Sequence, residues 1–348
     1  MAAEGGGAAG ICQLEVAVNV RIVAEAAQGY EGKIDYCHLY VKAAAKAGAE
    51  AVKFQVVYAD DICEPGHIHY EIFRSLEMPV EQWQAVKDHA DKLGITFVAD
   101  IFGERSLRIV EKIRPRGIKI HTTDFFNRDL VKAAFGIADR VFVSTGGAAA
   151  AEIDELVGQI EGWGARKRLV LLCGFQAEPT PIDRSGLSKI PALRARFPDI
   201  DIGYLDHTAG DSPDRVQVSA MAMAMGATWI EKHITLSRYL EIEDYISALE
   251  PDEFAEYVTA MKRLGTAIGS GNLELTDEER TYRDKAMKKV LAARPLKAGT
   301  KVRAEDVKLI RSPRIPPGTG VHDPRLCVGR RLVRDVALEA PILADCLE

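Results

Sequence analysis

Two stretches of the sequence place acidic, basic and imidazole side chains where apolar runs end. They are GYLDHTAGDSP at 203–213 and TWIEKHITL at 228–236. The first runs into Asp206 and His207, and the second into Glu231, Lys232 and His233. Charged residues are depleted in strands, so strand formation alone does not explain them. They are either hydrogen-bonded structural residues at strand ends or a metal site at the open face of a barrel.

Metal chemistry is plausible because two imidazoles end successive apolar runs, at His207 and His233. Neutral imidazoles, together with water and a carboxylate, suit Mn²⁺, Zn²⁺, Fe²⁺ or Co²⁺. A single histidine at a strand end is more often a structural residue, and the pair leaves both interpretations open. The other histidines are interpreted as structural residues, with His121 as the main exception because it lies at the end of a predicted strand.

Eight apolar, β-rich runs alternate with helical patterns, as in a (β/α)₈ barrel. The expected strands are 21–27, 50–57, 95–101, 117–122, 140–147, 168–174, 201–208 and 228–235. The segments 35–48 and 79–94 have helical spacing and end at glycine. SAMAMAMG at 219–226 alternates like a strand, but its good helix formers and the βα rhythm predict a helix. A doubly wound open sheet is the alternative, and no GxGxxG follows the first strand to support it.

A barrel of this type carries its active site at the carboxyl ends of the strands. The polar residues expected there are Glu25, Lys53, Gln55, Asp100, Lys119, Thr122, Asp124, Ser144, Thr145, Gln176, Asp206, His207, Glu231 and His233. Lys53 and Gln55 share one face by strand alternation. If they point inward, Lys53, Lys119, Ser144 and the amides of the STGG turn form a cradle for phosphate or carboxylate.

Length and composition predict two domains. Residues 1–18 are expected to be a flexible tail, 19–270 the barrel, 271–287 a linker and 288–348 a small module that leans on a partner. The net charge of −6 argues against a nucleic-acid or membrane-surface protein, and no apolar run is long enough to span a membrane. The six cysteines form no CxxC pair, which favours a reduced, cytoplasmic protein. The opening MAAEGGGAAG has no basic start and no long apolar run, so it is not expected to be a signal peptide.

The motifs of the chain resemble those of the sialic acid (N-acetylneuraminate) synthase family. The matching stretches are AEAAQGYEG at 24–32, AGAEAVKFQ at 47–55, IKIHTTD at 118–124, VSTGG at 143–147, DHT at 206–208, EKHIT at 231–235 and LEPDEF at 249–254. The segments AARPLKAGT, EDVKLIRS, PGTG and VGR resemble the family's antifreeze-like (SAF) domain. The combination is specific, whereas any one motif alone is not.

The resemblance implies a reaction in which phosphoenolpyruvate condenses with the open-chain aldehyde of an N-acylated hexosamine. The products are a nine-carbon 2-keto acid and phosphate, formed with C–O cleavage. A divalent metal polarises the aldehyde, with Mn²⁺ or Mg²⁺ favoured and Co²⁺, Zn²⁺ or Fe²⁺ as alternatives. The resemblance also implies a domain-swapped homodimer, in which Arg314 enters the partner's site.

The resemblance implies roles for individual residues. His207 and His233 match the metal ligands, and Glu25 matches a sugar-contacting carboxylate. Asp124 stands where the family usually has Glu, as a proton-handling or water-positioning group. The residues at positions that contact phosphoenolpyruvate are Lys53, Gln55, Lys119, Thr122 and Ser144. The other residues expected to bind substrate are Asp100, Gln176, Glu178, Asp206, Asp244 and Arg314.

The sequence departs from the family on the acceptor side. QGYEG replaces NHxG, Ala99-Asp100-Ile101 replaces Ser-Thr-Pro, CGFQAEP replaces HCTxxYP, and IEDY replaces GPDH. Asp100 and Glu178 add negative charge, so the acceptor is expected to differ from plain N-acetylmannosamine; an amino-bearing sugar is one option. Three functions remain open: a nonulosonic acid synthase, a phosphoenolpyruvate-condensing enzyme with another acceptor, and an inactive sugar-binding relative.

Overall fold

The computed structural model describes residues 20–311, 315 and 319–348. The predicted tail at 1–18 and Arg314 therefore lie outside the described residues. The chain divides into two compact units between Gly271 and Asn272. Each unit is described by itself below.

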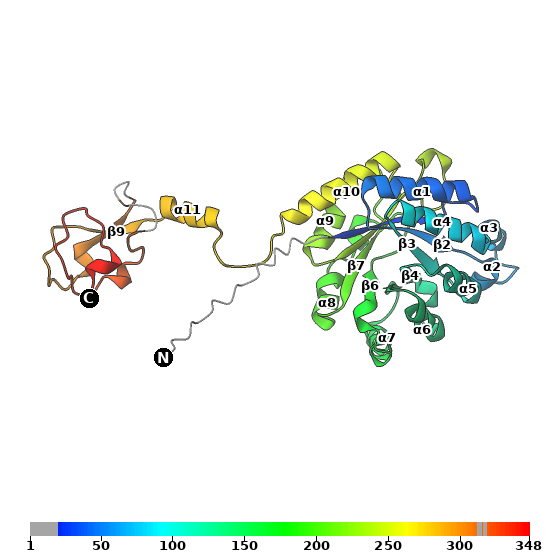
Figure 1. Cartoon of the computed structure of the whole chain (residues 1–348), viewed down its shortest axis with the longest axis horizontal. Helices are drawn as coiled ribbons and strands as arrows, with labels where there is room; N and C mark the ends of the chain where they lie inside the picture. Colours follow the sequence, from blue (N-terminus) through cyan, green and yellow to red (C-terminus); the bar gives the residue numbers. More distant parts are fainter. Residues whose placement is uncertain (1–19, 312–314, 316–318) are drawn as a thin grey trace, which may run out of the picture. The chain divides into compact units, whose positions relative to one another are not determined.

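The first unit is a closed barrel of eight parallel strands in sequential order (Figure 1). The strands are β1 (Arg21–Ala27), β2 (Ala51–Val56), β3 (Thr96–Ile101), β4 (Gly117–Ile120), β5 (Arg140–Ser144), β6 (Leu169–Cys173), β7 (Asp201–Asp206) and β8 (Trp229–His233). Pairing of β1 with β8 closes the ring. The predicted (β/α)₈ barrel is confirmed, and each strand lies within its expected range.

Helices cover the outside of the strands (Figure 1). They are α1 (Ile34–Ala47), α2 (Ala59–Ile62), α3 (Tyr70–Ser75), α4 (Val80–Lys92), α5 (Glu104–Ile113), α6 (Arg128–Ile137), α7 (Ala150–Gly162), α8 (Lys189–Arg196), α9 (Gln217–Ala224) and α10 (Pro251–Thr266). Short 3₁₀ turns are η1 (Thr122–Asp124), η2 (Arg166–Arg168), η3 (Ile182–Arg184) and η4 (Arg238–Leu240). The helix predicted from SAMAMAMG is confirmed as α9. Within the part of the chain that the structure describes, no helix has the length and apolar character needed to cross a membrane.

Strand alternation divides the barrel interior into an apolar layer and a charged layer. The apolar layer comprises Val23, Ala51, Val98, Phe142, Val170, Leu172, Leu205 and Trp229. Gly203 makes room for it, since a Cβ there would lie 2.5 Å from Leu172 Cδ2. Two residues further along their strands, Glu25, Lys53 and Asp100 point to the same interior. The polar residues found at the strand ends therefore stand directly above a packed apolar core.

Residues of the opposite parity face the helices, and Asp206 and Lys232 are among them. These two residues are register partners on β7 and β8, and Lys232 Nζ lies 3.2 Å from Asp206 Oδ1. Lys232 also donates to the carbonyl oxygen of Thr208 at 2.6 Å, and Ser219 of α9 donates to Asp206. Both members of the pair are fully buried. The ion pair therefore joins two strands one residue before His207 and His233.

A Lys232→Met variant is expected to lower the free energy of unfolding by about 3–5 kcal/mol, because Asp206 is left buried without a cation. Urea denaturation followed by circular dichroism measures it. The Asp206→Asn/Lys232→Met double variant should recover part of the loss, since an amide keeps hydrogen bonds without a charge. A loss below about 1 kcal/mol in the single variant, the size of an exposed pair, would contradict this role.

The second unit is small and has its own core. It contains α11 (Asp277–Ala286), the antiparallel strands β9 (Lys289–Ala292) and β10 (Val307–Ile310), and the turns η5 (Ala304–Asp306), η6 (Pro324–Leu326) and η7 (Ala344–Cys346). Its buried residues include Val290, Leu296, Val302, Leu332 and Ile342. The segment 271–287, which was expected to be a linker, contains α11.

Candidate active site

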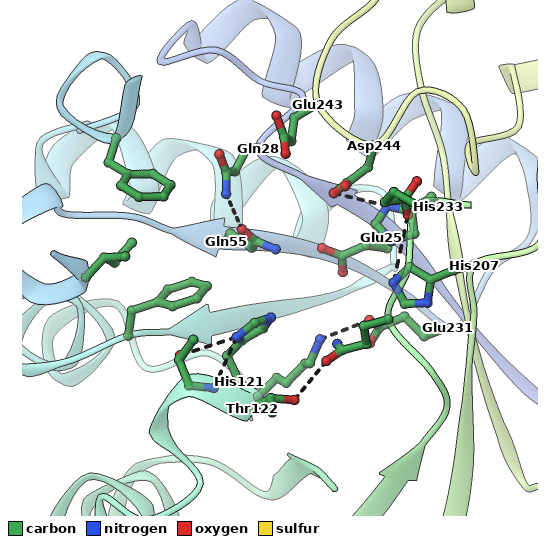
Figure 2. Close-up of a pocket in the computed structure, with 17 residues that line it drawn as sticks. Glu25, Gln28, Gln55, His121, Thr122, His207, Glu231, His233, Glu243 and Asp244 are labelled. Carbon is green, nitrogen blue, oxygen red and sulfur yellow. Dashed lines mark hydrogen bonds and ion pairs between the residues drawn. The ribbon is translucent and has the colours of Figure 1, made fainter. Parts of the chain in front are cut away.

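A cavity of about 430 Å³ opens at the carboxyl ends of the barrel strands (Figure 2). This size suits a small ligand. Ionisable side chains dominate its lining: Glu25, Lys119, His121, Glu178, His207, Glu231, His233, Glu243 and Asp244. Gln28, Gln55, Thr122, Thr123 and Gln176 add hydrogen-bonding groups, and Ile62, Phe73 and Phe102 add an apolar side.

Five buried charges form the layer on which this cavity rests, here called the charged floor: Glu25, Lys53, Asp100, Lys119 and Glu231. None of these side chains is more than 5% exposed. Lys119 Nζ lies 3.1 Å from Asp100 Oδ2 and 3.0 Å from Glu231 Oε1. Lys53 Nζ lies 3.2 Å from the same two oxygens and also pairs with Glu25. Two ammonium groups therefore sit side by side, bridged by shared carboxylates.

The pairing controls the ionisation of the charged floor. Burial opposes the charged forms of Asp100 and Glu231, but Lys119 and Lys53 hold both pKa values below their usual range. Burial raises the pKa of Glu25 to about 8, although Lys53 partly offsets it. Burial also opposes the charge on Lys53, but the carboxylates Glu231, Glu25 and Asp100 raise its pKa well above the usual value.

Two imidazoles and one carboxylate form a candidate metal centre beside the charged floor. Ligand atoms of Glu178, His207 and His233 all lie within 4.8 Å of one another. The two rings have centroids 5.0 Å apart, and Glu178 Oε1 lies 4.0 Å from His207 Nε2. Burial lowers the pKa of His207 to about 4 and that of His233 well below the usual value. Both rings are therefore neutral at physiological pH, the form that binds metal.

These residues fit a divalent cation. The Nδ1 atom of His207 is buried and has no hydrogen-bond partner among the described residues, which is unusual for a polar atom. Burial raises the pKa of the Glu178 carboxyl to about 8, so no cation of the chain stabilises its charge sufficiently. A donor set of two nitrogens and one oxygen suits Mn²⁺, Fe²⁺, Co²⁺ or Zn²⁺ better than Mg²⁺, which prefers oxygen ligands.

The family comparison rests on both units of the chain. Residues 40–273 match the NeuB family, and residues 290–348 match the SAF domain. The chain belongs to the NeuB family. The predicted resemblance to sialic acid synthases with an SAF domain is thereby confirmed, and the chain is an enzyme of a synthase family.

Several proteins are similar to this NeuB chain over most of its length. It is 31% identical to the uncharacterized protein MJ1065 of Methanocaldococcus jannaschii, over 88% of each chain. It is 26% identical to the N,N'-diacetyllegionaminic acid synthase of Legionella pneumophila, over 94% of each chain. The N-acetylneuraminic acid (sialic acid) synthetase of Leptospira borgpetersenii, solved with citrate, has a TM-score of 0.70 and 29% identity, covering 77% of this chain and 92% of that one.

Most of the residues expected to form the site lie in the cavity of this NeuB chain or in the layer below it. Gln55, Lys119, Thr122, Gln176 and Asp244 line the cavity, as do Glu25, Glu178, His207 and His233. Lys53 and Asp100 lie in the charged floor beneath it. Ser144 is buried, and its hydroxyl lies 2.7 Å from that of Thr122, which also donates to Gln176 Oε1 at 2.8 Å.

Two expected site residues have other surroundings. Asp206 faces the helices and pairs with Lys232, so its side chain points away from the cavity. Asp124 does not line the cavity; its carboxylate accepts hydrogen bonds from Thr123 Oγ1 at 3.0 Å and Asn127 Nδ2 at 3.2 Å. Their predicted substrate and catalytic roles remain predictions.

The structure adds residues that the sequence reading did not select for the site. Gln28 donates to Gln55 Oε1 at 2.8 Å on one side of the cavity (Figure 2). Glu243 precedes Asp244, whose Oδ2 lies 3.6 Å from His233 Nδ1. Burial and Glu243 raise the pKa of Asp244 to about 6. Gln28 directly follows β1, and Glu243 lies next to Asp244, which was expected to bind substrate. These positions in the loops were the available signal in the sequence that either residue belongs to the site.

Proposed function

We propose that this NeuB chain condenses phosphoenolpyruvate with the open-chain aldehyde of an N-acylhexosamine, giving a nine-carbon 2-keto acid and phosphate. The acceptor is N-acetylmannosamine or a modified relative. One observation carries the proposal: Lys119 lines the same cavity as the metal-binding set of His207, His233 and Glu178, and Lys53 lies beside Lys119 in the floor beneath it. Relatives named as acid synthases support the same reaction class.

The reaction forms one carbon–carbon bond and one carbon–oxygen bond from water, and it breaks the carbon–oxygen bond to phosphate. The methylene carbon of phosphoenolpyruvate bonds to the aldehyde carbon, whose oxygen takes up a proton. Water adds to the former enol carbon and loses one proton. The resulting hydroxyl loses its second proton as the bond between that carbon and the phosphate oxygen breaks, which leaves the 2-keto group and releases phosphate. Rigid strands hold both substrates at fixed positions, which lowers the activation barrier because the reacting atoms are already oriented toward each other.

Charged and neutral side chains of the site have different roles in this reaction. Lys53 and Lys119 bind the phosphate and carboxylate groups through charge-assisted hydrogen bonds. Thr122 and Gln176, which bond to each other, orient the same substrate through neutral hydrogen bonds. His207, His233 and Glu178 would hold a divalent ion such as Mn²⁺, which would supply Lewis-acid polarisation of the aldehyde oxygen.

The acceptor side of the cavity is acidic. Glu178, Glu243 and Asp244 line it, and burial raises the pKa of both Glu178 and Asp244. Carboxylates accept hydrogen bonds from sugar hydroxyl and amino groups. This side therefore suits a hydroxyl-rich acceptor, including one with a free amino group.

A phosphate-release assay tests the proposed function. The full chain is incubated with phosphoenolpyruvate, Mn²⁺ and a panel of hexosamines, including N-acetylmannosamine, diacetamido-trideoxyhexoses and their free-amine forms. Acceptor-dependent phosphate release with a nine-carbon product by mass spectrometry is expected. Release only with acceptors that are not acylamino sugars would favour the alternative condensing enzyme, and absence of both release and phosphoenolpyruvate binding would favour an inactive sugar-binding protein.

A Glu178→Tyr variant is expected to change acceptor preference. Removing a carboxylate should lower kcat/KM for amino-bearing acceptors about tenfold relative to N-acetylmannosamine, because one charge-assisted hydrogen bond is lost. The ratio of kcat/KM for the two acceptors is measured at saturating Mn²⁺, so that weaker metal binding by the variant affects both acceptors equally. Glu241→Gln, outside the cavity, is the matched control. An unchanged ratio would contradict the claim that the charge of Glu178 favours amino-bearing acceptors.

We further propose that the enzyme works as a domain-swapped homodimer in which Arg314 of one chain completes the partner's site. Apolar side chains in the loops that follow alternate strands support a cover over this face of the barrel. They are Ile68, Phe126, Phe175 and Tyr239, which are 85%, 64%, 51% and 96% exposed. The five cysteines of the described residues are all free thiols, which supports the cytoplasm as the proposed location.

Mixing two variants, each impaired in a different substrate, tests the swap. Arg314→Ala is expected to raise the acceptor KM with little effect on phosphoenolpyruvate, and Lys119→Met to abolish phosphoenolpyruvate binding. If Arg314 acts across the dimer, mixed dimers contain one intact site, and about a quarter of all sites should recover at low acceptor concentration. No recovery after subunit exchange, verified by native mass spectrometry, would show that Arg314 does not act in the partner's site.

A further inference from the structure

Asp100 occupies the space between the two lysines of the charged floor. Its Oδ2 atom lies 3.2 Å from Lys53 Nζ and 3.1 Å from Lys119 Nζ. The side chain is fully buried. The same oxygen therefore already fills the position in which an anionic group would contact both ammonium groups.

The two lysines of the floor are already paired with acidic side chains before any substrate binds. Three carboxyl groups, Glu25, Asp100 and Glu231, face two ammonium groups, Lys53 and Lys119. Among the described residues, Lys119 is the only Lys or Arg that lines the cavity. An anion approaching this floor meets lysines whose charge is compensated, and carboxylates at short range repel it in a poorly solvated site.

The Asp100 carboxylate is anchored through only one of its two oxygens. Its other oxygen, Oδ1, is buried and has no hydrogen-bond partner among the described residues. Only the lysines anchor the carboxylate, whereas Asp206 on the outer face is bound by an ammonium group, a hydroxyl and a backbone amide. A competing anion thus has to displace a carboxylate that has no second anchor.

We propose that Asp100 is a resident counter-anion of the Lys53–Lys119 pair and determines how tightly the enzyme binds an anionic substrate. This inference rests on the proposed function, since phosphoenolpyruvate is the anion that competes for the lysines. Removing the negative charge at Asp100 leaves Lys53 paired with Glu25 and Glu231 and Lys119 paired with Glu231, so both lysines keep an acidic partner. The Asp100→Asn variant is therefore expected to fold and to bind anions more tightly.

Calorimetric titration of the full chain with phosphoenolpyruvate, in the presence of Mn²⁺, tests the proposal. Asp100→Asn should lower Kd at least about tenfold relative to the unsubstituted chain. Asp201→Asn is the matched control, because Asp201 Oδ2 also bridges two cations, Arg21 at 3.1 Å and Arg140 at 3.2 Å, at the other end of the barrel. The control should leave Kd unchanged.

The outcomes separate this inference from the proposed function. Equal or weaker phosphoenolpyruvate binding by Asp100→Asn, with turnover intact in the unsubstituted chain, overturns the role of Asp100 and leaves the function standing. If neither protein binds phosphoenolpyruvate, the proposed function fails, and titration with inorganic phosphate decides the inference. Tighter phosphate binding by Asp100→Asn supports it, and equal or undetectable phosphate binding by both proteins overturns it. Circular dichroism and thermal melts confirm that each variant is folded.

Discussion

A His207→Ala variant is expected to lose Mn²⁺-dependent turnover by about a thousandfold or more, because removal of one imidazole dismantles the metal-binding set and its Lewis acid. The substitution removes a side chain whose Nδ1 atom has no partner in the described structure, so little folding stability should be lost with it. Phosphate release with saturating Mn²⁺ measures turnover, and electron paramagnetic resonance of free Mn²⁺ measures metal binding.

His89→Ala is the control for this variant. His89 lies on α4, where its Nδ1 atom is 2.9 Å from that of His38, away from the cavity lining. It should keep Mn²⁺ binding and turnover. Turnover of His207→Ala within about tenfold of the unsubstituted chain would mean that the imidazole pair does not hold the catalytic ion.

A Lys119→Met variant is expected to weaken phosphoenolpyruvate binding by about a hundredfold or more, because one ammonium group of the pair is lost from a buried site. It is also expected to lose stability, since three carboxylates would then face Lys53 alone. Calorimetry measures binding, and thermal unfolding measures the change in stability.

The Lys119→Met/Asp100→Asn double variant separates binding from folding. Its remaining charges are one lysine and two carboxylates, which restores the net charge that the floor has in the unsubstituted chain. Stability should recover, while phosphoenolpyruvate affinity should remain lower than in Asp100→Asn alone. Full recovery of binding together with stability would show that Lys119 acts only as a structural counterion.

The barrel was predictable because its signals are local and repeated. Each strand is a short apolar run, and eight such runs separated by helical patterns fit one architecture. Even the Met- and Ala-rich segment of α9, which alternates like a strand, was resolved by helix propensity and the position it occupies in the βα rhythm. The boundaries of the strands shifted by only a few residues from those expected.

The sequence predicted most of the residues of the site, but it predicted less well how their side chains are arranged. Strand parity places Glu231 and His233 inward and Lys232 outward, and the same parity, counted from Leu205, turns Asp206 toward the helices. Applied strictly, this rule would have separated Asp206 from the cavity before the structure was known. The pairing of two lysines with shared carboxylates was not readable, because it joins residues from four strands.

Loops limited the prediction further. Glu178 was expected on the acceptor side from its place in the sequence, and the structure also brings its carboxylate into the set with His207 and His233. Gln28 and Glu243 lie in loops whose path depends on tertiary contacts. Sequence spacing fixes the strand that precedes such residues but not the direction of their side chains.

A crystal structure of the full chain with phosphoenolpyruvate and Mn²⁺ tests the central claim most directly. We expect the metal at His207 and His233, and anionic oxygens of the substrate within hydrogen-bonding distance of both Lys53 and Lys119, with Asp100 displaced from between them. Substrate bound in another part of the molecule, or Mn²⁺ without an imidazole ligand, would contradict the claim that these side chains form one condensing site.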